Sequence, residues 1–146
     1  LEVIGSNRCA RWHQDWYAGR MIVTYCGPST WMVDDKDINF EMFEAGLNEE
    51  EEMVPEVTNP IIVPEFERIK RPGANSVMLI KGNLWPGIED TVNGMGVVHK
   101  APDDVGKDSN GDIEKRLVLK VDLSSDPPPK LPTLEELEAE FNATQE

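Results

Sequence analysis

The segment from Arg116 to Leu123 constrains the fold most, because apolar and polar residues alternate along it. Side chains of a β-strand point alternately to its two faces, so Leu117 and Leu119 share one face and Arg116 points to the other. A period of two excludes a helix and predicts a strand over this segment. If the leucines fill the interior, Arg116 faces solvent; a strand buried on both faces would instead keep Arg116 inside.

Further short runs of β-branched and aromatic residues predict additional strands, separated by turn signals such as Gly27-Pro28. These strands are expected at 20–26, 31–33, 60–63, 76–81 and 95–101. Outside the C-terminal tail a single helix is predicted, around 40–51. Many short strands with little helix predict an all-β fold of antiparallel sheets, either a sandwich or a barrel.

Two segments carry the acidic character of the chain, which has 28 Asp and Glu, 14 Lys and Arg and a formal net charge of −14. Residues 34–56 hold ten acidic residues and 124–146 hold six, each with one basic residue. The rest of the chain has twelve of each sign. Nucleic-acid binding is not expected, because phosphate recognition needs a basic face. Each acidic segment is either solvated surface or a docking surface for a basic protein partner.

The length of 146 residues fits one domain, which we place at 1–124 with an acidic insertion at 34–56. The tail at 125–146 opens with prolines, which favour an extended polyproline conformation. It continues with Thr133-Leu134-Glu135-Glu136, a capping-box pattern that predicts a short helix to about Phe141. We expect such a tail to rest on a protein partner.

No apolar run is long enough to span a membrane, and no signal-like stretch follows Leu1. The chain is therefore expected to be soluble and intracellular, either cytoplasmic or organellar. Because it lacks an initiator Met, we expect a processed form of a longer chain. Cys9 and Cys26 are too few for a disulfide framework and are expected to be small buried thiols, with one bridge between them as the alternative.

The chain has only two histidines, His13 and His99. Asp15 follows His13 at the i+2 position, so in a strand the imidazole and the carboxylate point to the same face. His99 ends an apolar run far along the chain. Two imidazoles and one carboxylate form the ligand set that holds Fe(II) on one face and leaves coordination positions open. The alternative is two structural or surface histidines beside an unrelated Asp15.

The surrounding sequence resembles the uncharacterised DUF1826 family over about residues 8–124, which is the whole body without the acidic insertion and the tail. The segments that carry the resemblance are 11–15, 21–30, 77–82, 85–87, 97–102 and 116–122. By pattern the chain also resembles the double-stranded β-helix oxygenases, jelly-roll or cupin-like proteins that use Fe(II) and 2-oxoglutarate. That resemblance implies a double-stranded β-helix fold and both of these cofactors.

Carried over by position, the resemblance implies that His13, Asp15 and His99 are the iron ligands. Arg116 would bind the far carboxylate of 2-oxoglutarate, since its planar guanidinium matches the two oxygens of a carboxylate. Tyr25 would donate a hydrogen bond to the same carboxylate. The sequence departs from the oxygenase pattern at Val118, where a small polar residue is common, and in a long loop between His99 and Arg116.

Two functions follow as hypotheses. The first is a metal-binding dioxygenase-like oxidoreductase of unknown substrate; the same ligands could instead hold Zn or Mn in a cupin-like barrel with another reaction. The second is a non-catalytic β-barrel subunit of a larger assembly, which would dock through its acidic insertion and C-terminal tail.

Overall fold

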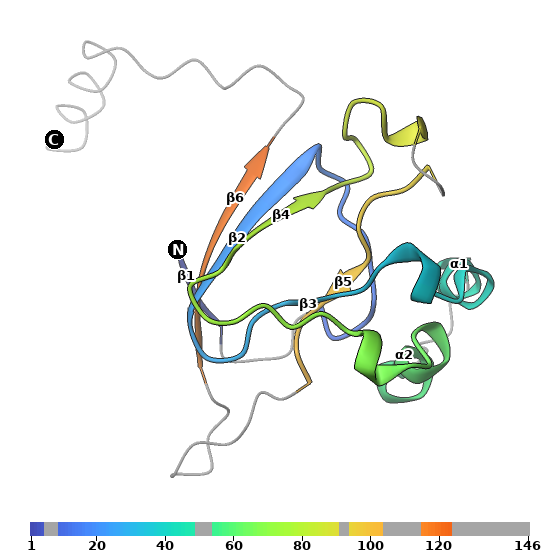
Figure 1. Ribbon diagram of the computed structural model, residues 1–146, viewed down its shortest axis with the longest axis horizontal. Coiled ribbons are helices and arrows are strands. Elements are labelled where there is room, and N and C mark those ends of the chain that lie inside the picture. The colour runs from blue at the N-terminus through green and yellow to red at the C-terminus, as the bar shows by residue number, and fades with distance from the viewer. Residues whose placement is uncertain (5–8, 49–53, 91–93, 104–114, 124–146) are drawn as a thin grey trace, which may run out of the picture.

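A computed structural model of the chain describes residues 1–4, 9–48, 54–90, 94–103 and 115–123 (Figure 1). The strands are β1 (Glu2–Ile4), β2 (Gly19–Cys26), β3 (Trp31–Met32), β4 (Val77–Lys81), β5 (His99–Lys100) and β6 (Arg116–Leu123). The helices are α1 (Phe40–Asn48) and α2 (Pro55–Ile62), with short 3-10 turns at Asp35–Asp37, Phe66–Arg68 and Ile88–Asp90. The fold is therefore mostly β, with two short helices. The predicted tail helix lies outside the described residues.

The strands form two antiparallel sheets. The larger, sheet A, has the order β1-β6-β2-β4, and the smaller, sheet B, pairs β3 with β5. Isolated bridges widen sheet B on both sides, from His13 to His99 and from Met32 to Lys70. Figure 1 shows sheet B between sheet A and the two helices.

Two hydrophobic clusters connect these layers. One lies between the two sheets and is built on Ile22, Met78, Ile80 and Val118, with Met32 packed against it from sheet B. The other joins sheet B to the helices and is formed by Trp12, Trp31, Val33, Phe43, Ile62, Val63 and Val98. Sheet B is thus covered on both faces.

The strand predictions for sheet A are confirmed at β2, β4 and β6, within one residue. The run predicted at 95–101 is paired as a strand only over β5. The predicted strand at 60–63 is wrong, because this run ends helix α2 and its Ile62 packs in the core beside the helices. Pro55 occupies the first turn of α2, where its missing N–H costs no helical hydrogen bond.

The predicted double-stranded β-helix does not emerge from the described residues, in which no closed barrel or jelly roll is formed. Sheet B contributes only two strands, and helices cover its other face. The acidic insertion is also more than solvated surface: Phe43 of α1 is 2% exposed and belongs to the core beside the helices. Neither α1 nor α2 could reach across a bilayer, and the described residues contain no other candidate.

Candidate metal centre

The backbone brings His13 directly opposite His99. Each residue donates its N–H to the carbonyl oxygen of the other, at 3.0 Å in both directions. Residues opposite each other in an antiparallel pair point to the same side, and the two imidazole centroids are 4.5 Å apart. Trp12, the neighbour of His13, points the other way and is buried at 4% exposure. The core therefore fixes which way His13 faces.

Asp15 lies beside the two histidines because its backbone segment packs closely against the segments of Gly82 and Gly96. Its carbonyl oxygen accepts a hydrogen bond of 2.9 Å from the N–H of Asn83. Gly82 makes this approach possible: a Cβ there would lie 2.0 Å from the carbonyl oxygen of Tyr17. Gln14 ties the segment to Gly96 by a 2.8 Å hydrogen bond from its side-chain amide to the Gly96 carbonyl. Only glycine fits where the backbones touch.

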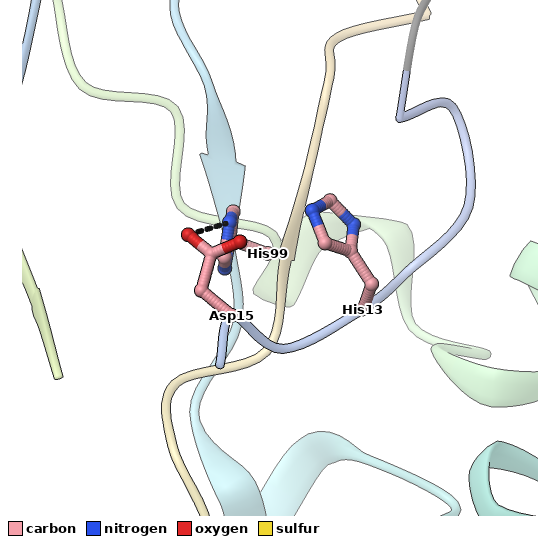
Figure 2. Close-up of side chains that lie close together, drawn as sticks. All are labelled: His13, Asp15 and His99. Atoms are coloured by element: carbon pink, nitrogen blue, oxygen red, sulfur yellow. Dashed lines mark ion pairs between the residues drawn. The ribbon is translucent and has the colours of Figure 1, made fainter. Parts of the chain in front are cut away.

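The three side chains converge as the sequence predicts (Figure 2). One ligand atom from each of His13, Asp15 and His99 can be chosen so that all lie within 4.8 Å of one another. Asp15 Oδ2 is 3.4 Å from His99 Nε2, and the two side chains are only 11% and 4% exposed. Neighbouring ligands of one cation at 2.0–2.2 Å are about 3 Å apart, so these atoms would have to move closer together to share one ion.

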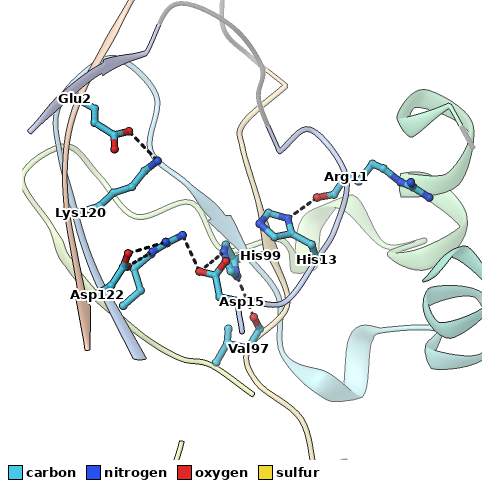
Figure 3. Close-up of polar contacts among 9 residues, drawn as sticks. Glu2, Arg11, His13, Asp15, Val97, His99, Lys120 and Asp122 are labelled. Carbon is cyan, nitrogen blue, oxygen red and sulfur yellow. Dashed lines mark hydrogen bonds and ion pairs between the residues drawn. The ribbon is translucent and has the colours of Figure 1, made fainter. Parts of the chain in front are cut away.

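Both imidazoles present the same nitrogen to the site. His13 Nδ1 lies 2.8 Å from the carbonyl oxygen of Arg11, and His99 Nδ1 lies 3.0 Å from that of Val97 (Figure 3). A carbonyl oxygen only accepts hydrogen bonds, so each Nδ1 carries the proton. In the neutral ring Nε2 then has a free electron pair. This is the arrangement by which proteins orient histidine ligands of metals.

The guanidinium of Arg20, which also contacts Asp122, lies beside the carboxylate of Asp15. Arg20 Nη1 is 2.9 Å from Asp15 Oδ2, and the same guanidinium contacts both oxygens of Asp122 at 2.5 and 3.1 Å (Figure 3). Burial tends to raise the pKa of Asp15, but the hydrogen bond and charge of His99, with the charge of Arg20, outweigh it and lower the pKa. Asp15 is therefore a carboxylate at neutral pH.

Sequence reasoning missed Arg20 and Cys9 as parts of this site. Arg20 lies on β2, far from Asp122 in the sequence, and no local pattern indicates that the two side chains meet. Cys9 hydrogen-bonds His13, which lowers the pKa of the thiol. Burial tends to lower the pKa of His13, but this bond and the one to Arg11 raise it. The expectation of buried thiols is wrong, since Cys9 and Cys26 are both exposed, and both are free.

A family model described as DUF1826, a protein of unknown function, matches residues 1–122. The chain belongs to the DUF1826 family. No curated protein and no solved structure matches the chain. The family prediction is thus confirmed, whereas the resemblance to Fe(II)/2-oxoglutarate oxygenases receives no support from these comparisons. The chemistry of this DUF1826 chain must therefore be argued from its own residues.

Arg116, predicted to bind a cosubstrate, is buried at 5% exposure. It pairs with Ile4 and lies two residues before Val118, so it points to the face of sheet A that is turned toward sheet B. The solvent-facing alternative is therefore wrong for this DUF1826 chain. Burial lowers the pKa of Arg116, and a negative charge at Cys9 would oppose this effect.

Three buried side-chain atoms in the described part of the chain have no hydrogen-bond partner: Asp15 Oδ2, Thr24 Oγ1 and Arg116 Nε. Asp15 belongs to the histidine group, while Thr24 and Arg116 lie on neighbouring strands of sheet A. Arg20 and His99 approach Asp15 Oδ2 within ion-pair distance, but without hydrogen-bond alignment. Buried polar atoms are normally paired, so these three atoms leave hydrogen-bonding capacity for a polar ligand.

The structure does not bring Tyr25 to this space. Tyr25 is 46% exposed, whereas Thr24 before it is buried at 3%. Because neighbouring residues of a strand point to opposite faces, Tyr25 belongs to the other side of sheet A. Of the residues predicted for the site, His13, Asp15 and His99 converge, Arg116 points into the same layer and Tyr25 points away.

Proposed function

We propose that this DUF1826 chain binds a divalent transition-metal ion through His13, Asp15 and His99 and works as an Fe(II)/2-oxoglutarate-type oxygenase. One observation carries the proposal: His99 Nε2 faces Asp15 Oδ2 at 3.4 Å inside the protein. The bond from Nδ1 to Val97 leaves Nε2 with an electron pair in the neutral ring. With a second imidazole beside them, these two electron-pair donors form a group that can hold a cation.

The donor set favours iron among the candidate metals. Two imidazoles and one carboxylate on one face are typical of non-haem Fe(II) sites, although Zn and Mn also bind these donors. Bound Fe(II), with 2-oxoglutarate and O2, would supply the oxidation of a substrate C–H bond, with succinate and CO2 as the other products. The residues of the chain would hold the ion, orient the carboxylate of the cosubstrate and keep the site dry.

Arg116 is proposed as the anchor of the cosubstrate. Its guanidinium is buried and its Nε lacks a partner, so an entering carboxylate would gain a charge-assisted hydrogen bond. Thr24, on the neighbouring strand, offers an unpaired hydroxyl as a further polar group. Tyr25 is left out of the proposal because its side chain is exposed on the opposite side of the sheet.

The double-stranded β-helix fold is part of the same proposal. Two antiparallel sheets with the ligand group between them are compatible with a double-stranded β-helix, whose closure would require strands outside the described residues. Docking of a protein partner through the acidic insertion also stays a prediction. The buried Phe43 supports a structural role for part of that insertion.

Metal analysis with a matched carboxylate control tests the proposal. The full chain is purified without oxygen, stripped with a chelator and titrated with Fe(II), Zn(II) and Mn(II), followed by assay of 2-oxoglutarate conversion to succinate. We expect one equivalent of metal in the wild type, loss in His13→Ala and His99→Ala, and retention in Asp35→Asn, which changes a carboxylate away from the site. Equal metal content in all four proteins would refute the metal site. Metal binding without succinate formation, with or without candidate substrates, would refute the oxygenase assignment.

A further inference from the structure

The outer face of sheet A is apolar and largely exposed in the described part of the chain, although the central Val23 is buried. Five of its aliphatic side chains are 41–72% exposed: Val3, Val77, Leu79, Val121 and Leu123. Polar and charged residues normally occupy the solvent face of an antiparallel sheet, so that apolar and polar residues alternate along each strand. An exposed apolar sheet face of this kind marks a contact surface.

The strand register makes these side chains one continuous surface. Met21 of β2 lies opposite Leu79 of β4 on one side and Val121 of β6 on the other. In the next row Val23 lies between Val77 and Leu119. Residues in one row point to the same face, so the rows stack into an apolar patch across three strands. We call this patch the outer face.

One end of the outer face already has a boundary. Gly19 lies between Lys81 and Leu123 in the last row. The ring of Trp85 packs against Gly19, so closely that a Cβ at that position would lie 3.1 Å from the ring. The exposed Lys81 stands beside this ring, with Nζ 5.5 Å from its centroid. The open part of the outer face therefore has an aromatic wall and a basic group at one end.

We propose that residues 133–141 of the same chain cover the outer face as an amphipathic helix. This inference is independent of the proposed metal chemistry. The sequence places Leu134, Leu137 and Phe141 at i, i+3 and i+7, which is one face of a helix, while Glu135 and Glu136 fall on the opposite face. The apolar stripe would meet the outer face, and the acidic side would face water.

The length and origin of the tail favour it over another occupant. It follows directly on Leu123, which is itself part of the outer face. The connecting residues 124–132 can span about 30 Å when extended, whereas four paired strands are only about 15 Å wide. A helix over 133–141 is about 13 Å long and fits on such a sheet. A second copy would have to bring together two chains that each carry a net charge of −14.

Site-specific photo-cross-linking tests this inference in the full 146-residue chain. A photoreactive phenylalanine analogue is placed at Leu79, and for comparison at the exposed Lys36 outside the outer face. After irradiation, mass spectrometry identifies the attached peptide and the total mass. We expect the position 79 probe to capture a peptide from 126–146 at the mass of one chain, and the position 36 probe to capture none.

Paired tail variants sharpen the result. Leu137→Asp with Phe141→Asp should lower the cross-link yield at position 79 by at least about tenfold, since the transfer of two apolar side chains is lost. Glu135→Gln with Glu136→Gln, on the opposite helix face, should leave the yield unchanged. A product with the mass of two chains would assign the outer face to a second copy and overturn the proposal. Absence of the tail peptide, or a yield that both variant pairs leave unchanged, would overturn it as well.

Discussion

His13 and His99 exchange backbone hydrogen bonds of 3.0 Å in both directions, and their imidazole rings lie 4.5 Å apart on the same side of sheet B. This pairing joins two segments that are distant in the sequence. Asp15 shares the site because the segment that follows His13 is held by hydrogen bonds to Asn83 and Gly96. Backbone contacts therefore bring the three candidate ligands together. Substitutions around them should affect metal binding and stability separately.

Replacement of Arg20 should weaken metal binding without removing a ligand. Arg20→Met removes the group that holds the Asp15 carboxylate, and outer-shell changes of this kind cost about 10–100-fold in metal affinity. The affinity is measured by competition with a chelating dye. Arg68→Met, which removes an exposed ion pair with Glu65, is the control and should have no effect. Unchanged affinity in Arg20→Met would show that Asp15 needs no such support.

Gly82→Ala should destabilise the protein. A Cβ at this position would meet the Tyr17 carbonyl oxygen at 2.0 Å, so the backbone segments around Asp15 must separate. Overpacking of this kind costs about 1–3 kcal/mol, which urea denaturation resolves. Gly73→Ala is the matched control, because nothing lies within 4 Å of a Cβ there. Equal midpoints in the two variants would contradict the close approach.

The stability of the metal-free protein should depend on the charge of His13. The folded protein raises the pKa of His13, so protonation contributes stability that is fully present below the unfolded value of about 6.5. That contribution is lost as the pH rises through the folded pKa. Urea denaturation from pH 5.5 to 8.5 in a chelator should show this loss, and His13→Gln should remove it. Cys9→Ser should reduce it, because the Cys9 hydrogen bond helps raise the pKa. A profile unchanged in His13→Gln would disprove this assignment.

Arg116→Met should separate stability from cosubstrate binding. Replacing a buried, incompletely paired charge by an apolar side chain of similar length should leave stability unchanged or raise it by about 1 kcal/mol. The affinity for 2-oxoglutarate, measured by calorimetry with the metal-loaded protein, should fall by at least about tenfold, as expected for a lost charge-assisted hydrogen bond. Metal affinity should stay the same. A variant that unfolds, or that binds 2-oxoglutarate normally, would show that Arg116 is structural.

The sequence by itself determined most strands of sheet A and the identity of the candidate ligands. The alternation over Arg116–Leu123 required a strand, and β6 has these limits. The spacing of His13 and Asp15 and the scarcity of histidine indicated the ligand group that the structure brings together. These features could be predicted because side-chain direction along a strand depends on the local backbone alone.

Only the tertiary structure decided which side of each element faces inward. In β6 the sequence left open whether Arg116 faces solvent or the interior. The structure buries Arg116 and Val118, because sheet B packs on their side. The apolar run that ends at Val63 became part of a helix and its cap, since Ile62 and Val63 find their partners in Trp31 and Phe43. Arg20 likewise meets Asp122 and Asp15 only after folding. Alternation fixes that a strand has two faces, but contacts between distant segments fix what each face meets.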